Sequence, residues 1–209
     1  MLKEKFKTNR VFKVHNSHYS DAIYILGVFI NMHLARFIFN SVLGWSIQGG
    51  FDKNTLKTVV TVAPHTSWHD FYIGALVRKI INLPIHYVAK RELFDSPFGW
   101  YFRWMGGEPI ERSSNQNKVE QIVSLFKSKK EFRLAIAPEG TRKKVNTWKT
   151  GFYYIAHQAE VPITMVAFDY ASKTVKISNP FLTTGDYDND MIEIRQFYQG
   201  VVGKVPEFT

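Results

Sequence analysis

The chain contains no cysteine among its 209 residues. This absence excludes disulfide bonds, a thiolate nucleophile and zinc held by cysteine. The N-terminus also lacks the pattern of a secretory signal peptide, because no small-residue cleavage site follows its apolar stretch. Together these absences are typical of a protein that works in the cytoplasm.

A serine nucleophile on a Gly-x-Ser-x-Gly turn is also missing. The nearest segment, Gly44–Gly49, has one residue too many between its outer glycines. With neither a cysteine nor this serine turn, we do not expect a covalent enzyme intermediate. A catalytic histidine would instead activate an acceptor group directly.

Negative charge is scarce relative to positive charge. The chain has 18 Asp and Glu against 27 Lys and Arg, a net charge of +9. Basic proteins favour polyanions, which means nucleic acid, phosphorylated small molecules or an anionic lipid surface. Residues 1–14 form a basic arm in which Phe6 and Phe12 are interleaved with lysine and arginine. This arm is either a solvated tail or a segment that docks on anionic lipid.

Charge is almost absent from residues 22–51, where Arg36 is the only formally charged residue. Ala22–Leu43 predicts a helix in which His33, Arg36 and Asn40 share one polar stripe. Three interpretations are open: a membrane span, a helix buried against the domain, or a helix lying in the membrane interface. In the last case, Arg36 would reach out to the headgroups.

After residue 44, short apolar strands alternate with helices. This alternation predicts an α/β fold, a single domain with a twisted, mostly parallel sheet flanked by helices. In such folds, ligands bind beyond the carboxyl ends of the strands. The expected strands are Trp45–Gly50 and Thr58–Ala63, joined by a turn at Asp52–Asn54, then Ile85–Ala89, Arg133–Ala137, Pro162–Phe168 and Thr174–Ser178. The expected helices are Ser67–Ile80, Pro97–Met105, Asn115–Lys127, Gly151–Ala159 and Tyr187–Val202.

The segment His65–Asp70, HTSWHD, follows the expected strand Thr58–Ala63. Ser67 and Asp70 have the S-x-x-D spacing of a helix capping box, so Asp70 has a purely structural interpretation. The same geometry bends the chain and lets the Asp70 carboxylate return toward the His65 imidazole. An aspartate on one ring nitrogen fixes the tautomer and leaves the other nitrogen as a base. Both interpretations stay open on these residues alone.

His65 and His69 have the spacing of a metal-binding pair. No HExxH glutamate and no obvious third ligand accompany them. We therefore expect neither a metal nor another cofactor.

Glycine and arginine occur together at two further turns. Pro138–Arg142, PEGTR, follows the expected strand Arg133–Ala137, and Gly106–Arg112 follows the aromatic helix. Glycine allows close backbone approach, and arginine can hold a phosphate through two parallel hydrogen bonds. Lys90, directly after the strand Ile85–Ala89, adds a third cation at the same expected edge. Ordinary solvated turns are the alternative to a phosphate site.

In order and spacing, these motifs resemble those of the glycerophospholipid acyltransferase family. His65–Asp70 is similar to the family's H-x4-D motif, Gly106–Arg112 to its second motif and Glu139–Arg142 to its EGTR motif. Val161–Ile163 resembles the start of the fourth motif. The resemblance covers roughly Trp45–Ser178 and depends on the combination, because each motif alone is weak.

The resemblance implies that His65 is the general base and that Asp70 orients it. The donor would be an acyl thioester of coenzyme A or of acyl carrier protein, and the acceptor a lysophospholipid such as lysophosphatidic acid. The residues implied to hold the acceptor are Lys90, Arg112, Glu139, Gly140, Thr141 and Arg142.

The resemblance also implies attachment to a membrane surface. We therefore expect residues 1–43 to be a basic arm and membrane-associating helix, and residues 44–209 to be the acyltransferase domain. The protein would be peripheral or monotopic on the cytoplasmic face of the cell membrane, with lipid as its partner.

Three positions depart from the usual family pattern. Pro64 stands where asparagine is common, Pro109 where an aromatic is common, and Met165 replaces a proline of the fourth motif. The catalytic pair is intact, so the departures bear on the acceptor, and another lysolipid such as an amino-acid-headed one is an alternative. A non-catalytic lysolipid-binding protein is a second alternative. A nucleic-acid-binding module explains the charge but not the ordered motifs, so no nucleic-acid partner is expected.

Overall fold

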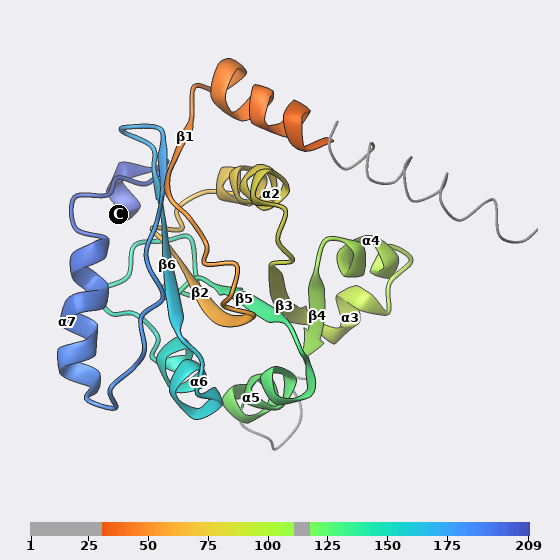
Figure 1. Cartoon of the computed structure of the whole chain (residues 1–209), viewed down its shortest axis with the longest axis vertical. Coiled ribbons are helices and arrows are strands. Elements are labelled where there is room, and N and C mark those ends of the chain that lie inside the picture. The colour runs from red at the N-terminus through yellow and green to blue at the C-terminus, as the bar shows by residue number, and fades with distance from the viewer. Residues whose placement is uncertain (1–30, 111–117) are drawn as a thin grey trace, which may run out of the picture.

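The computed structural model describes residues 31–110 and 118–209. Within these ranges, seven strands form one sheet in the order β1-β7-β6-β2-β5-β3-β4 (Figure 1). Neighbouring strands run parallel, except that β6 and β7 are antiparallel. The mostly parallel sheet predicted from the sequence is confirmed. The strands are β1 (Ser46–Gly49), β2 (Lys57–Ala63), β3 (His86–Lys90), β4 (Gly107–Ile110), β5 (Phe132–Ile136), β6 (Ile163–Asp169) and β7 (Thr174–Ile177).

Helices lie on both sides of this sheet (Figure 1). Residues 31–37 are helical and continue into a π-helical turn, η1 (Ile38–Val42). A short 3-10 turn, η2 (Pro206–Phe208), lies close to the C-terminus. The α-helices are α2 (His69–Ile81), α3 (Arg91–Phe94), α4 (Gly99–Trp104), α5 (Lys118–Ser128), α6 (Gly151–Ala159) and α7 (Tyr187–Phe197).

Two apolar clusters form the core, one on each face of the sheet. Successive side chains of a strand point to opposite faces, so Val59 belongs to one cluster and Val60 to the other. The Val59 cluster includes buried residues of α5, α6 and α7, and the Val60 cluster includes buried residues of α2. The central strand β6 is buried along its whole length, as expected of a strand covered on both faces.

The described part of the expected helix Ala22–Leu43 packs on the domain. Ala35 and Phe39 are buried in the Val60 cluster. Leu34 and Phe37 are exposed, so an apolar face also remains in contact with solvent. Among the described residues, no helix has both the length and the apolar character to cross a membrane. Residues 22–30 and the basic arm lie outside the described residues, so the membrane-associating role stays a prediction.

The strand partners differ from the expectation for β1. The turn at Asp52–Asn54 does not join two strands that are neighbours in the sheet, because β7 and β6 lie between β1 and β2. Gly49 allows β1 to approach β7 closely: a Cβ at Gly49 would lie 2.1 Å from the Ile177 carbonyl oxygen. A local turn signal cannot specify which distant strand lies alongside, because parallel pairing is set by tertiary contacts.

Two elements were not expected from the sequence, and the end of one helix differs by several residues. The stretch expected to be only a turn contains the edge strand β4, in which Pro109 is tolerated because an edge strand has unpaired groups. The short helix α3 was not anticipated. Helix α7 ends at Phe197 rather than Val202, because Gly200 adopts a positive φ of 74° and turns the chain. The expected start of the helix Asn115–Lys127 lies outside the described residues.

Candidate active site

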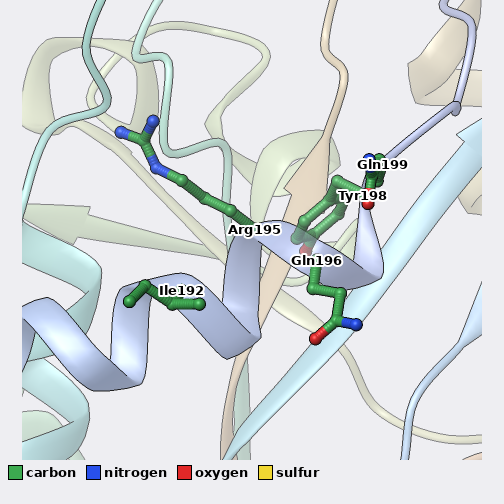
Figure 2. Close-up of a pocket in the computed structure, with 5 residues that line it drawn as sticks. All are labelled: Ile192, Arg195, Gln196, Tyr198 and Gln199. Carbon is green, nitrogen blue, oxygen red and sulfur yellow. The ribbon is translucent and has the colours of Figure 1, made fainter.

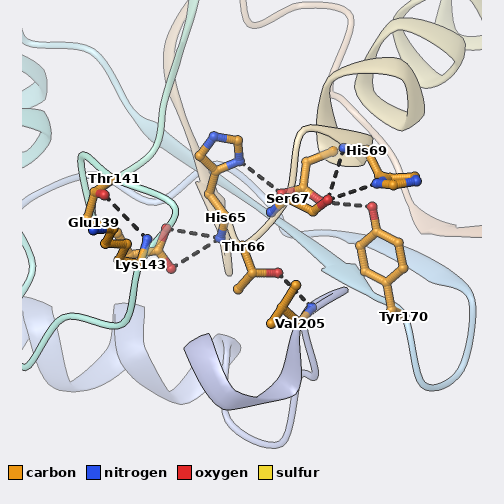
Figure 3. Close-up of polar contacts among 10 residues, drawn as sticks. His65, Thr66, Ser67, His69, Glu139, Thr141, Lys143, Tyr170 and Val205 are labelled. Atoms are coloured by element: carbon orange, nitrogen blue, oxygen red, sulfur yellow. Dashed lines mark hydrogen bonds and ion pairs between the residues drawn. The ribbon is translucent and has the colours of Figure 1, made fainter.

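Three adjacent parallel strands deliver the polar residues of the site to one edge of the sheet. His65 follows β2 by two residues, Glu139 follows β5 by three, and Tyr170 comes directly after β6. The strands are neighbours in the order β6-β2-β5, so their carboxyl ends meet (Figure 3). The site therefore lies where ligands bind in open parallel sheets.

His65 and Asp70 face each other across the bend that precedes α2. The His65 Nδ1 atom lies 2.9 Å from Asp70 Oδ2. The Asp70 side chain is only 2% exposed, whereas that of His65 is 30% exposed. In the part of the chain that the structure describes, His65 Nε2 has no hydrogen-bond partner. The carboxylate thus holds one ring nitrogen and leaves the other available as a base.

The same carboxylate oxygen also completes the start of α2. The Ser67 backbone N–H donates to Asp70 Oδ2 at 3.1 Å, and the His69 N–H donates to Ser67 Oγ at 3.3 Å. Helix α2 begins at His69, two residues later than expected. The capping contact and the contact to His65 therefore coexist.

His69 is engaged locally rather than turned toward His65. Its Nδ1 lies 2.8 Å from Ser67 Oγ, and its ring centre lies 4.3 Å from that of Trp68, with the two ring planes tilted by 34°. Across residues 31–110 and 118–209, no group of three or more His, Asp or Glu side chains is arranged to hold a metal ion.

Tyr170 contacts the other oxygen of Asp70. Its hydroxyl donates to Asp70 Oδ1 at 2.7 Å, and its ring lies edge-on to Trp45 at 4.8 Å. Burial raises the pKa of Tyr170 well above its ordinary value, and the hydrogen bond to Asp70 raises it further. The phenol therefore stays protonated and remains a donor. Sequence reasoning missed Tyr170, and the available signal was its place directly after a buried strand at the same edge.

Glu139 contacts the backbone of the histidine. Both of its carboxylate oxygens accept from the His65 N–H, at 3.0 and 3.2 Å. Burial raises the pKa of Glu139, and the hydrogen bond from the His65 N–H opposes this rise. The observed contact positions the His65 backbone. That Glu139 also helps to hold the acceptor stays a prediction.

The remaining EGTR residues turn beside the histidine. Gly140 has a φ of 65°, which favours glycine, and Thr141 Oγ1 accepts from the Lys143 N–H at 3.3 Å. An open hollow of about 410 Å³ lies here. Phe208 of η2 reaches it because the Val205 N–H donates to Thr66 Oγ1 at 3.1 Å. The hollow is lined by Thr66, Ser67, Trp68, Thr141, Arg142, Lys143 and Phe208.

The other two expected cations are placed less fully. Lys90 is exposed at the carboxyl end of β3, which pairs with β5, and its side chain has no hydrogen bond or ion pair within the described ranges. Arg112 lies outside the described residues. The structure therefore places Arg142 at the hollow that Thr66 and Ser67 also line, puts Lys90 on the same edge of the sheet, and describes no position for Arg112.

A second hollow, of about 610 Å³, lies at α7 (Figure 2). Its lining includes Ile192 and Arg195, and the Arg195 guanidinium lies 5.8 Å from the centre of the Trp148 ring. None of the residues predicted to be functional lines it. The candidate active site is therefore the edge that carries His65 and Asp70.

Comparison with known proteins bears on this site. A model of the acyltransferase family matches residues 46–169, which include His65, Asp70 and the EGTR turn. Tyr170 is the next residue after this match.

Among curated proteins, a 1-acyl-sn-glycerol-3-phosphate acyltransferase of Streptococcus pneumoniae is 32% identical over 136 residues, which is 61% of this chain and 50% of the relative. The Escherichia coli protein of the same name is 25% identical over 134 residues, 61% of this chain and 53% of the relative. The coconut (Cocos nucifera) protein of that name is 31% identical over 124 residues, 56% of this chain and 39% of the relative. The chain spans about half the length of the two bacterial relatives. The family match extends over more than half of the chain, and the chain belongs to the glycerophospholipid acyltransferase family.

Proposed function

We propose that the protein transfers a fatty acyl chain from a thioester to a hydroxyl group of a lysophospholipid. The observation that carries the proposal is the 2.9 Å contact between His65 Nδ1 and buried Asp70, with His65 Nε2 left for the acceptor. Family membership supports the same reaction class.

The reaction follows from the properties of these two side chains. Nε2 takes the proton of the acceptor hydroxyl while the hydroxyl oxygen attacks the thioester carbonyl carbon. The carbon–sulfur bond then breaks, and the proton passes from the imidazolium to the departing thiolate. Asp70 stabilises the imidazolium in between. The products are an acylated lipid and a free thiol, on coenzyme A or on acyl carrier protein.

The proposed acceptor is lysophosphatidic acid. Three relatives are named 1-acyl-sn-glycerol-3-phosphate acyltransferases, and Arg142 and Lys143 line the hollow beside the histidine. Arginine and lysine favour a phosphate by charge, and arginine also by its paired donors. Lys90 and Arg112 are proposed to add to this grip. The alternative acceptor is another lysolipid, such as an amino-acid-headed one.

We also propose that the protein acts at the cytoplasmic face of the cell membrane. Its acceptor is a lipid, its net charge of +9 favours anionic surfaces, and Leu34 and Phe37 are exposed on the helix of residues 31–37. No cofactor is required beyond the acyl donor.

The function is tested by thiol release. The purified protein is given acyl-CoA or acyl carrier protein thioester with a panel of lysolipids, and His65→Ala is the control variant. We expect release with lysophosphatidic acid, and none with His65→Ala. Release only with a different lysolipid would show that this lysolipid, and not lysophosphatidic acid, is the acceptor. Binding of lysolipid without release from any donor would identify a non-catalytic lysolipid-binding protein.

A further inference from the structure

The short helix α4 and the residue before it carry a cluster of exposed aromatic side chains. Phe98, Trp100 and Trp104 are 67–70% exposed, and Tyr101 is exposed as well. The Tyr101 ring centre lies 6.1 Å from those of Trp100 and Trp104, so the rings are contiguous. We call these four residues the aromatic surface. Contiguous apolar patches on a soluble protein typically mark a site of interaction.

The opposite side of α4 is held firmly, so the outward direction of these rings is set by packing. Phe102 contacts buried Phe94 with ring centres 6.2 Å apart, and Arg103 donates to the Phe94 carbonyl at 3.0 Å. A Cβ at Gly99 would lie 1.9 Å from the same carbonyl oxygen, so the helix start is pressed against α3. The helix cannot turn its tryptophans inward without losing these contacts.

We propose that the aromatic surface is a contact of the protein with an anionic lipid bilayer. Tryptophan and tyrosine pair an apolar ring with a polar atom, which suits the boundary between headgroups and acyl chains. Exposed Arg103 belongs to α4 itself, exposed Lys90 directly precedes α3, and the whole chain carries a net charge of +9. This charge complements anionic headgroups. A strongly apolar protein partner lacks that match to a mixed aromatic and basic surface.

A bilayer contact at the aromatic surface would serve the reaction if the acceptor is a membrane lipid, and in this respect the inference rests on the proposed function. Helix α3 begins immediately after Lys90, at the carboxyl end of β3, and α4 follows it. That end of β3 is on the edge that carries Glu139 and His65. A bilayer on the aromatic surface would hold the protein at the membrane that carries its proposed lipid acceptor. In Figure 1, α3 and α4 lie beside β4, and α7 lies on the opposite side beside β6.

The test is vesicle binding by the full chain. The double substitution Trp100→Ser, Trp104→Ser removes two rings, and Leu182→Ser, Ile192→Ser is the matched control. The control residues are 69% and 67% exposed, and Ile192 belongs to α7 on the far side. Sedimentation with vesicles of phosphatidylcholine and phosphatidylglycerol measures the affinity, and circular dichroism checks folding.

We expect the tryptophan variant to bind these vesicles at least about tenfold more weakly, because each buried ring contributes an amount equal to roughly tenfold in affinity. The control variant should bind like the unmodified protein. The proposal would be overturned if the tryptophan variant bound vesicles as tightly as the unmodified protein. It would also be overturned if both variants lost affinity to the same extent. If the double variant does not fold, Trp104→Ser alone is compared with the control. In addition, vesicles of brominated lipid should quench the tryptophan fluorescence of the unmodified protein, and an absence of quenching would contradict the proposal.

This readout requires no turnover, so it separates the surface from the proposed function. If the protein binds vesicles through these tryptophans but releases no thiol, the proposed lipid contact is supported and the proposed function is contradicted. With an active enzyme, the tryptophan variant should lose activity on vesicle-borne acceptor and keep it on a soluble short-chain acceptor. Equal loss on both acceptors would also contradict a membrane role.

Discussion

Asp70 and Asp190 are two buried carboxylates in closely similar settings at different places in the fold. Each lies in the first turn of a helix, Asp70 in α2 and Asp190 in α7. Each accepts a 2.7 Å hydrogen bond from a tyrosine hydroxyl, Tyr170 or Tyr153. Each also accepts a backbone N–H from the segment that enters its helix.

The two sites differ in the remaining partner. Asp190 accepts from the Thr184 hydroxyl at 2.8 Å, a group that does not titrate in the range of protein chemistry. Asp70 instead faces the His65 ring at 2.9 Å, and that ring is partly exposed. Only the second arrangement can accept a proton from a ligand and stabilise the resulting charge. A buried, hydrogen-bonded aspartate is thus structural by default, and an accessible base beside it makes it a candidate for chemistry.

The largest expected effect on turnover comes from substitutions of His65 and Asp70. His65→Ala should abolish acyl transfer, and Asp70→Asn should lower the turnover number by about 10²–10⁴, the range for a positioned acid–base group. Initial rates of thiol release measure both. Thermal unfolding should show His65→Ala folded. Near-normal turnover of His65→Ala would place the chemistry elsewhere.

Asp190→Asn should produce the opposite result. It replaces a carboxylate that accepts three hydrogen bonds in the buried region, and each hydrogen bond to a charged group contributes about 1.5–3 kcal/mol. We expect the free energy of unfolding to fall by about 3 kcal/mol, and turnover per folded molecule to stay unchanged. Urea unfolding together with active-fraction assays makes the measurement. A large loss of turnover with intact stability would remove the distinction between the two aspartates.

The pH dependence of stability provides a control for that variant. Burial raises the pKa of Asp190, but hydrogen bonds from Tyr153 and Thr184 outweigh it and hold the pKa below the ordinary value of 3.8. The ionised form therefore stabilises the fold above about pH 4, and this contribution is lost as the pH falls through the lowered pKa. Asp190→Asn should lose less stability than the unmodified protein on acidification in that range.

Two exposed arginines extend the comparison to the two hollows. Arg142→Ala should weaken use of the acceptor by about 1.5–3 kcal/mol, the range for one charge-assisted contact, while leaving donor use unchanged. Arg195→Ala, at the hollow on α7, is the matched control and should leave both unchanged. Steady-state kinetics with varied acceptor and donor distinguish these outcomes. An unchanged acceptor KM and turnover in Arg142→Ala would mean that the phosphate binds elsewhere.

The smallest expected effects come from the paired tyrosines. Tyr170→Phe and Tyr153→Phe each remove one hydroxyl that donates to a buried aspartate, a hydrogen bond that contributes about 1.5–3 kcal/mol. Tyr170→Phe should lower the turnover number roughly tenfold and alter its pH profile, because Asp70 loses a restraint. Tyr153→Phe should lower only stability. Identical kinetic behaviour of the two variants would show that Tyr170 does not position Asp70.

Local sequence patterns predicted much of this architecture. Helix α6 has the predicted bounds Gly151–Ala159, and the expected parallel sheet is present. These elements follow from apolar spacing and from glycine and proline at their ends, which act over a few residues. The bend between His65 and Asp70 could be anticipated for the same reason, because the S-x-x-D spacing that predicts it is a local pattern.

Contacts between distant segments were not accessible to such patterns. Tyr170 and Asp70 are 100 positions apart, and Glu139 and His65 are 74 apart. The pairing of β1 with β7 and the edge position of β4 also depend on which strands lie side by side. Strand order is decided by the burial of whole faces, so a single segment carries little information about its neighbour.

The sequence by itself determined the alternation of strands and helices, the His65–Asp70 spacing and the resemblance to an acyltransferase. The tertiary structure alone decided that β6, β2 and β5 are adjacent, which brings Tyr170, His65 and Glu139 to one edge. It also decided that the aromatic surface faces outward, because Phe102 and Arg103 hold the other side of α4 against Phe94. The physical reason is one of range: hydrogen-bond spacing and turn chemistry act along a few residues, whereas close packing joins segments a hundred residues apart.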